Sequence, residues 1–189
     1  MKILFLDVET GGMDEIKQSL LTVGLVVWED NKILDELEIF ISKEKYDYVA
    51  AALNINKINL EELREKGTNE EDSLVLLNEF CSKHFGSNKI IIGGHNVAFD
   101  IGFIKALYRR NNQEFYDRFS YRLVDTGTIL RFLFMQGKFE EDISSSDRAF
   151  AYFGINFEEG KRHSALGDAS ATALLFTKLL EIDNKNINK

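Results

Sequence analysis

Lys2-Ile-Leu-Phe-Leu-Asp7-Val-Glu9-Thr10-Gly11-Gly12 stands at the start of the chain and decides the fold. Its apolar run is too short for a helix and predicts a buried β-strand over Ile3–Val8. Side chains alternate along a strand, so Asp7 and Glu9 point to the same face. Two carboxylates held this near to each other repel one another unless a cation neutralises their charges. The stretch therefore predicts half of a divalent metal site.

The rest of the chain predicts a mixed α/β sheet with helices on its faces, in which a strand meander precedes strands that alternate with helices. We expect one domain over residues 1–182 and a frayed tail over 183–189. Further strands are expected at Leu20–Glu29, Lys32–Ile41, Lys89–Gly93 and Arg122–Val124, with a tight turn at Asp30-Asn31. Helices are expected within 44–84 and over Ala98–Arg110, Thr126–Phe134, Ser146–Phe153 and Ser164–Leu180, with a loop at 136–147 and with Asn69 and Asp125 as helix caps.

The composition excludes several classes of protein. The chain has 189 residues, of which 44% are hydrophobic, and this suits a single domain with a substantial core. It contains no apolar run of about 18 residues, so no membrane-spanning helix is expected. Cys81 is the single cysteine, which excludes an internal disulfide and suits a reducing cytoplasm.

The charge is unevenly distributed along the chain. The net charge of −8 argues against broad binding to duplex nucleic acid. Residues 1–100 hold 10 basic and 19 acidic residues, whereas residues 101–170 hold 10 of each kind. If a polyanion binds, its phosphates are therefore expected against the second half of the chain.

Two more acids stand among apolar or small residues. Asp100 follows a predicted strand and lies on the first turns of a predicted helix, and Asp168 lies near the start of the last helix. With Asp7 and Glu9 they make four carboxylates, which can hold two hard divalent cations such as Mg²⁺ or Mn²⁺. A histidine is suited to deprotonate the attacking water, because imidazole changes its protonation near neutral pH.

Three segments together resemble the exonuclease motifs of the DEDDh (DnaQ-like) 3′–5′ exonucleases, a family that includes polymerase III epsilon-type proofreading enzymes and RNA-trimming enzymes. The segments are Phe5–Gly12, Gly94–Asp100 and His163–Ala169. They occur in the family's order, and the third carries His163 and Asp168 with four residues between them. The resemblance implies a ribonuclease H-like fold, with a five-stranded mixed sheet flanked by helices.

The resemblance also implies a role for each site residue. Asp7 would bridge two cations, Glu9 and Asp168 would help to hold the cation that carries the attacking water, and Asp100 would hold the second cation. His163 would be the general base. The substrate contacts are expected at Thr10 and Gly11 beside the terminal 3′-hydroxyl, at Met13 as an apolar wedge between the last two bases, and at Asn96 and Phe103. The glycines after Thr10 are expected to let the ligand approach the backbone closely.

The implied function is the release of nucleoside 5′-monophosphates from single-stranded or frayed 3′ ends, with DNA favoured over RNA and a DNA polymerase as a candidate partner. The segment Ser144–Phe153 departs from the leucine-rich pattern expected before the third motif, so the loop and helix there are expected to differ from the family.

Other interpretations remain at this point. One is an exoribonuclease that trims RNA, and another is a nuclease-like module that binds nucleic acid or a polymerase without catalysis. A haloacid dehalogenase-type phosphatase also begins with a strand and an acidic pair, but it needs Asp where this chain has Glu9. Asp125 is expected to cap a helix, His95 to be structural, and His84 to act as a favourable charge at a helix end.

Overall fold

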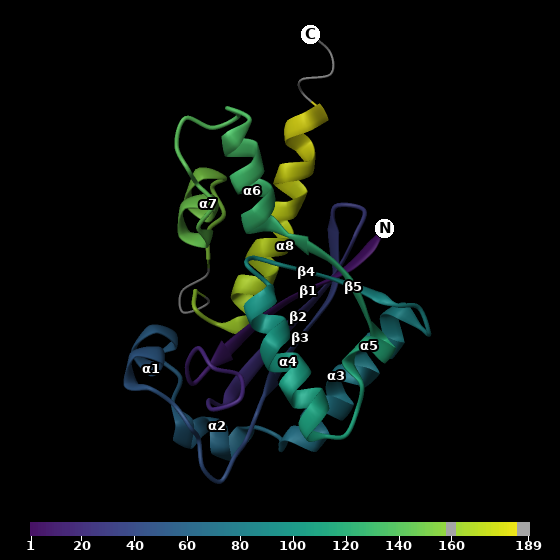
Figure 1. Cartoon of the computed structure of the whole chain (residues 1–189), viewed down its shortest axis with the longest axis vertical. Coiled ribbons are helices and arrows are strands. Elements are labelled where there is room, and N and C mark those ends of the chain that lie inside the picture. The colour runs from purple at the N-terminus through teal and green to yellow at the C-terminus, as the bar shows by residue number, and fades with distance from the viewer. Residues whose placement is uncertain (158–161, 185–189) are drawn as a thin grey trace.

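The computed structural model describes residues 1–157 and 162–184, and a five-stranded sheet runs through its centre (Figure 1). The strand order is β3-β2-β1-β4-β5. β1 pairs antiparallel with β2, and β2 pairs antiparallel with β3, whereas β4 and β5 run parallel to β1. The strands are β1 (Lys2–Thr10), β2 (Leu20–Glu29), β3 (Lys32–Phe40), β4 (Ile90–Gly94) and β5 (Phe119–Asp125). The predicted mixed α/β sheet is confirmed.

The hairpin between β2 and β3 follows from its turn residues. Asp30 and Asn31 have φ angles of 51° and 63°, so both lie in the left-handed region. Two successive residues in this region form the tight turn whose twist matches that of antiparallel strands, and Asp and Asn tolerate it. The predicted turn at Asp30-Asn31 is confirmed.

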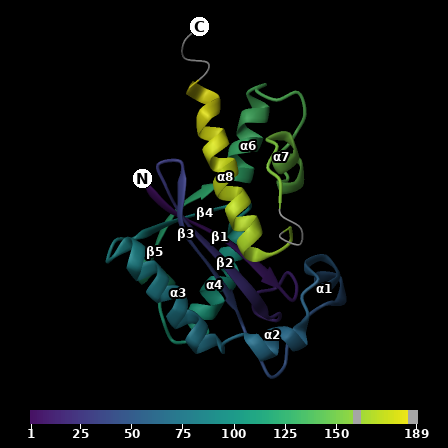
Figure 2. The same ribbon diagram turned by 180° about the vertical axis from the view of Figure 1, so that it is seen from behind.

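Helices cover the sheet on both faces, as the opposite views in Figures 1 and 2 show. On one face, α8 (Ala165–Asn184) packs Ala169, Ala173 and Phe176 against the β1 and β2 side chains of Ile3, Phe5, Val26 and Trp28. On the other face, α3 (Glu70–Phe85) and α4 (Ala98–Arg110) bury the alternate residues of the same strands. The sheet is therefore buried on both sides, and an acid on it is costly unless it is neutralised.

The remaining helices lie around this core. α6 (Thr126–Met135) and α7 (Ser146–Tyr152) pack beside the outer half of α8 in a cluster of their own. α1 (Ala50–Asn56) and α2 (Leu60–Lys66) lie near the carboxyl end of β1, and α5 (Phe115–Arg118) is a single turn before β5. No helix in the described part of the chain is long and apolar enough to cross a bilayer.

The region 44–84, within which helices were expected, is helical in three separate pieces. It contains α1, α2 and most of α3, because capping residues interrupt it. Lys57 adopts a left-handed conformation at the end of α1, and the side chain of Asn59 accepts hydrogen bonds from the first turn of α2. The predicted cap at Asn69 is confirmed, since its side chain accepts a hydrogen bond from the Asp72 amide at 2.9 Å.

The largest differences between predicted and observed element ends are those of β5 and α8. β5 is longer than Arg122–Val124, because its pairing with β4 begins at Phe119 in spite of several exposed polar side chains. α8 continues beyond its predicted end at Leu180 to Asn184, so it overlaps the start of the tail predicted over residues 183–189. Residues 185–189 of that tail lie outside the described residues.

Candidate active site

The candidate site lies where three parallel strands end. β1, β4 and β5 point the same way, so their carboxyl ends share one edge of the sheet. Asp7 and Glu9 lie on the last residues of β1, and Asp100 lies on α4, just after β4. The first turn of α8 brings Asp168 to the same edge. In α/β sheets this edge is the usual place for ligands to bind.

Three of the predicted ligands form a close cluster. Carboxylate oxygens of Asp7, Glu9 and Asp168 all lie within 4.8 Å of one another. Asp7 and Glu9 point to the face that α8 covers, as their spacing predicted. Gly24 lies opposite Asp7 on β2, and a Cβ there would stand 2.2 Å from the Ala165 carbonyl. The absence of a side chain at Gly24 therefore lets the start of α8 approach the strand and deliver Asp168.

Asp100 approaches the cluster from the other face of the sheet. Its side chain is 5% exposed, and its Oδ1 accepts a hydrogen bond from the Val8 amide at 2.9 Å. Val8 stands between Asp7 and Glu9 in the strand, so this bond ties α4 to the middle of the acidic pair. Asp100 is also the charge that acts most strongly on Asp7. The structure thus brings all four predicted carboxylates to one site.

The four carboxyl groups resist ionisation in the absence of a cation. Burial raises the pKa of Asp7 well above its ordinary value, and the charges of Asp100, Asp168 and Glu9 raise it further. Burial and the charge of Asp168 raise the pKa of Glu9 to about 8, although a hydrogen bond from Asn56 opposes this. Burial raises the pKa of Asp100 to about 7 and also raises that of Asp168. Such a cluster stores electrostatic free energy that a bound cation would release.

Arg162 supplies a positive charge beside this cluster. Its Nη1 donates to Asp168 Oδ2, and its Nη2 donates to Asp147 on α7. The guanidinium lies 5.5 Å and 5.3 Å from the ring centres of Phe150 and Phe157, which hold it by cation–π contact. The charge of Arg162 lowers the pKa values of Asp7, Glu9 and Asp168, against the stronger effect of burial. Arg162 therefore connects α7 to the acidic cluster.

His163 lies between Arg162 and the start of α8. Its φ of 62° places its backbone in the left-handed region, and α8 begins two residues later. Its half-buried side chain lines a cavity of about 610 Å³ together with Glu9 and Asn56. The predicted base and a predicted ligand thus face the same space, and the role of His163 as a base stays a prediction.

The residues present fit a hard divalent cation. The donors are all carboxylates, which Mg²⁺ and Mn²⁺ prefer. Among the residues that the structure describes, Asp168 Oδ1 is a buried oxygen that accepts no hydrogen bond. A buried acceptor without a partner is costly, and a bound cation would satisfy it. Asp7, Glu9, Asp100 and Asp168 are therefore the residues that would hold the metal.

The predicted substrate contacts at the end of β1 have different outcomes. Met13 is 81% exposed in the loop after β1, which leaves it available as a wedge. Thr10 is 7% exposed and lies next to the acidic pair, and its backbone oxygen accepts from Asn56. The prediction for Gly11 was wrong, because its amide and carbonyl are bonded to Ser19 and Val49. A Cβ on Gly11 would stand 2.4 Å from the Asp47 carbonyl, so the chain itself, not a ligand, requires glycine here.

The two predicted substrate contacts around α4 differ in their exposure. Asn96 is exposed, with a left-handed φ of 56°, and it lines a second cavity. The prediction for Phe103 was wrong, because its side chain is 1% exposed and packs against Phe99 in the core. Phe103 lies one helical turn after Asp100, on the face of α4 that the sheet covers. A ring buried there presents no surface to a nucleotide.

The residues expected to be structural take structural positions. Asp125 Oδ1 accepts from the Thr128 amide at 2.7 Å, which confirms the predicted cap of α6. Its Oδ2 also accepts from the Val97 amide, so it ties the start of α4 to β5. His95 Nδ1 lies 2.9 Å from the Thr126 hydroxyl. His84 near the end of α3 pairs with Asp35 on β3, a partner that the sequence did not indicate.

Sequence reasoning missed three residues that shape the site. Asn56 contacts both Glu9 and Thr10, although it ends a helix whose bounds were not predicted. Gly24 lies inside a strand with no turn nearby, and a glycine in a strand signals close backbone approach. Arg162 was noted only as one of several basic residues, since its partners Asp147 and Asp168 lie on separate helices.

A comparison with protein families decides the assignment. The sequence model of the family described as Exonuclease (RNase T) matches residues 4–176, which include all four carboxylates and His163. This chain belongs to the exonuclease family. As an exonuclease, it belongs to a group of nucleases that typically use divalent metals, in agreement with the acidic cluster. The recognition made from the three motifs is confirmed.

Curated relatives of this exonuclease include much longer proteins. A DNA polymerase III PolC-type of Latilactobacillus sakei subsp. sakei is 28% identical over 173 residues, and that of Listeria welshimeri serovar 6b is 30% identical over 175 residues. The alignments take in 92% and 93% of this chain but 11% of each relative. The exonuclease therefore corresponds to a small part of each polymerase chain.

Solved structures share the fold. A crystal structure of E. coli exonuclease I in complex with a dT13 oligonucleotide superimposes with a TM-score of 0.81 at 16% identity, over 99% of this chain and 42% of that one. The exonuclease I of Methylocaldum szegediense gives a TM-score of 0.80 at 18% identity, over 98% and 41% of the two chains. The predicted ribonuclease H-like class is confirmed.

Proposed function

We propose that this exonuclease works from 3′ ends, requires divalent cations, and releases nucleoside 5′-monophosphates from single-stranded or frayed DNA. The observation that carries the proposal is the convergence of Asp7, Glu9 and Asp168 within 4.8 Å, with Asp100 bonded to the same strand. An acidic cluster that resists ionisation without a cation suits metal-assisted hydrolysis of a phosphodiester. The number of ions, two, and their identity as Mg²⁺ or Mn²⁺ are part of the proposal.

The side chains divide the work. When bound, the cations would supply charge stabilisation for the attacking and leaving oxygens of the phosphodiester. The four carboxylates bind them. The imidazole of His163, which lines the same cavity as Glu9, accepts the proton of the attacking water. The backbone near Thr10 orients the terminal 3′-hydroxyl, and Met13 separates the last two bases.

Support for DNA comes from the relatives. The curated relatives are named as DNA polymerases, and the exonuclease I structure contains a dT13 oligonucleotide. RNA remains the second candidate, since no described contact distinguishes a 2′-hydroxyl. We also propose a DNA polymerase as partner and a cytoplasmic location. The phosphatase is excluded by the family, and a purely binding module is disfavoured because all four carboxylates are present.

The test is a time course on 5′-labelled single strands of DNA and RNA of equal sequence, with Mg²⁺ or Mn²⁺. We expect a ladder in steps of one nucleotide on DNA and no shortening in EDTA. Fragments cut at internal positions, or cleavage that resists EDTA, would contradict the proposal. Faster shortening of the RNA strand than of the DNA strand would identify RNA as the preferred substrate.

A further inference from the structure

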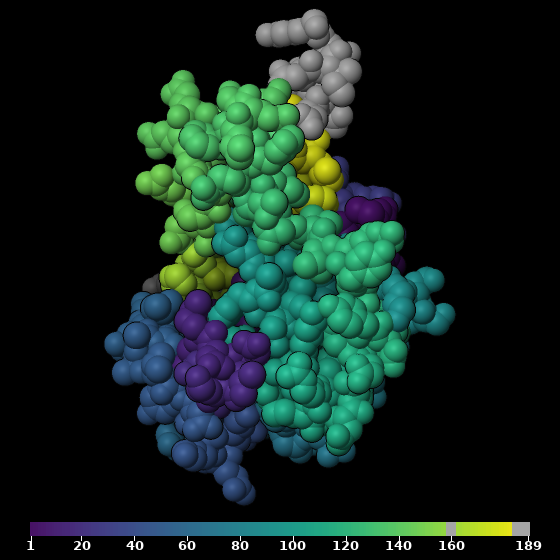
Figure 3. Space-filling model, viewed as in Figure 1, coloured from purple at the N-terminus to yellow at the C-terminus, as the bar shows by residue number. Residues whose placement is uncertain are grey.

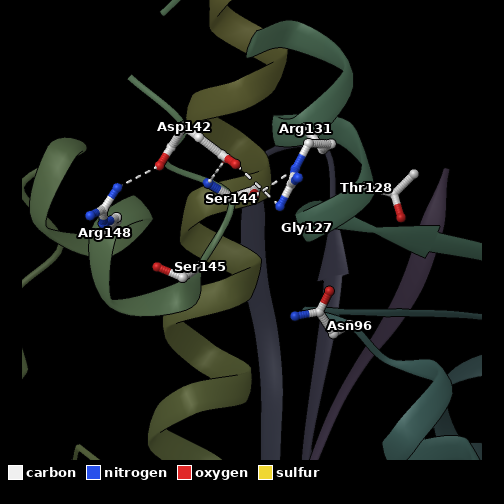
Figure 4. A pocket seen from close by; sticks show the side chains of 8 residues that line it. All are labelled: Asn96, Gly127, Thr128, Arg131, Asp142, Ser144, Ser145 and Arg148. Atoms are coloured by element: carbon white, nitrogen blue, oxygen red, sulfur yellow. Dashed lines mark hydrogen bonds and ion pairs between the residues drawn. The ribbon is translucent and has the colours of Figure 1, made fainter. Parts of the chain in front are cut away.

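A cavity of about 560 Å³ lies on the opposite side of the acidic cluster from His163. Figure 4 shows the side chains that line this cavity. The cavity that His163 lines includes the ends of β2 and β3, whereas this second cavity lies over the β4 and β5 side of the sheet. β1, which carries Asp7 and Glu9, runs between the two sides. The two cavities therefore flank the place where the scissile phosphate would lie.

The lining of this second cavity is polar and carries a net positive charge. It contains the guanidinium groups of Arg131 and Arg148 and a single carboxylate, that of Asp142. The other lining residues are small or neutral polar ones: Asn96, Gly127, Thr128, Ser144 and Ser145. No aromatic or aliphatic side chain lines it in the described part of the chain, so it offers hydrogen bonds and charge but no stacking surface for a base.

The two arginines are held in place around Asp142. Arg131 Nη2 lies 3.2 Å from Asp142 Oδ2, and Arg131 Nε donates to the Ser144 hydroxyl at 3.1 Å. Arg148 donates to the backbone oxygen of Asp142 at 3.0 Å. Figure 4 shows Asp142 between the two guanidinium groups. Planar guanidinium groups oriented in this way suit the oxygens of a phosphate.

Both walls of the cavity are joined to the candidate ligands. On one wall, Asn96 precedes Asp100 by four residues in the connection between β4 and α4. On the other wall, Ser144 and Ser145 lead into Ser146, whose hydroxyl accepts from Arg162, and Arg162 bonds Asp168. A strand that leaves the acidic cluster on this side would therefore pass directly into the cavity.

We propose that this cavity binds the phosphodiester backbone of the substrate strand on the 5′ side of the scissile bond, through Arg131 and Arg148. The inference rests on the proposed function, because it assumes that the terminal nucleoside lies beside Glu9 and Thr10. An enzyme with a net charge of −8 and an acidic centre needs local positive charge to hold a polyanion. Ser144, Ser145 and Arg148 form one wall of this cavity.

The test measures binding of fluorescent dT8 and rU8 to the full chain across a range of KCl concentrations. Asp7→Asn and EDTA prevent cleavage throughout, and each further variant is made in that background. We expect Arg131→Gln and Arg148→Gln each to weaken binding about three- to tenfold at 0.1 M salt. Each should also reduce the slope of log K against log salt by about 0.7, the value for one phosphate contact on a single strand. DNA and RNA should respond alike, since their phosphates are the same.

The matched control is Arg109→Gln, which removes the same charge at the exposed far end of α4. Equal effects at Arg109, Arg131 and Arg148, or no binding of either oligonucleotide, would overturn the proposal. If the unsubstituted protein cleaves oligonucleotides while the Arg131 and Arg148 variants bind them as well as the control does, this proposal fails and the proposed function stands. If the unsubstituted protein cleaves no oligonucleotide but the Arg131 and Arg148 variants lose affinity as expected, the proposed function fails and the binding site stands.

Discussion

Glu9 should make the metal-free protein less stable as the pH rises. The ordinary pKa of a glutamate is 4.5, and burial beside Asp168 raises that of Glu9 to about 8. Between these values the folded chain retains a proton that the unfolded chain has lost, so unfolding becomes easier as the pH rises. The contribution of protonated Glu9 to the free energy of unfolding is complete below pH 4.5. It is lost progressively as the pH rises to about 8.

The size of the effect follows from the same two values. Each pH unit within this interval costs about 1.4 kcal/mol of the free energy of unfolding. At pH 7 the free energy of unfolding of the metal-free protein is therefore lower by about 3 kcal/mol, because the folded chain holds the Glu9 proton that the unfolded chain releases. Asp100, whose pKa burial raises to about 7, adds to the loss in the same direction. A saturating divalent cation should abolish the loss, because it neutralises the ionised carboxylates.

The assay is urea unfolding followed by circular dichroism at pH 5, 6, 7 and 8, in EDTA and in Mg²⁺. Glu9→Gln should be more stable than the parent in EDTA at pH 7, by up to about 3 kcal/mol. In Mg²⁺ the order should reverse, since the variant lacks a ligand. Glu79→Gln, an exposed site on α3, is the control. The reasoning is refuted if the parent in EDTA keeps or gains stability between pH 5 and pH 8.

Three further predictions concern single side chains. Arg162→Gln should destabilise the metal-free protein by about 2–3 kcal/mol, because it leaves the mostly buried Asp168 without its partner, and urea unfolding in EDTA measures this. His163→Ala should lower the turnover of an oligonucleotide by about 10²–10⁴ while Mn²⁺ affinity by calorimetry stays close to that of the parent; an unchanged turnover would remove His163 from the mechanism. Met13→Ala should slow digestion of a matched duplex end more than that of a 3′-mismatched end, and equal slowing of both would argue against a wedge.

The sequence was sufficient for the sheet and for the shared face of Asp7 and Glu9, because both depend on local periodicity, whereas Asp100 and Asp168 were predicted from their apolar surroundings and from the resemblance to the exonuclease motifs. Asp7 and Glu9 share a face by the alternation of a strand, and their strand is buried on both sides. Phe103 was wrong because its position depends on which face of α4 the sheet covers, and that is a tertiary contact. Gly11 was wrong because the neighbour that excludes a side chain, Asp47, is remote in sequence.

The rest of the site depends on contacts between distant segments. Arg162 acquires its role from Asp147 on α7 and Asp168 on α8, and no spacing in the sequence indicates this pairing. The second cavity likewise combines Asn96, Arg131 and Arg148, which come from three separate elements. Sequence patterns predicted the acidic residues that lie together at the candidate site, and the fold was needed to show the cavities on either side of them.

The most direct test of the central claim is to identify the product released from a single strand of DNA that carries its label in the 3′-terminal nucleotide. With Mg²⁺ the parent should release that label first, as a nucleoside 5′-monophosphate. Asp7→Asn should abolish release while the variant remains folded by circular dichroism, because it removes a charge from the repelling cluster. Release of a 3′-monophosphate, release of the label only inside longer fragments, or an unchanged rate in Asp7→Asn would contradict the assignment of this acidic cluster as the catalytic centre.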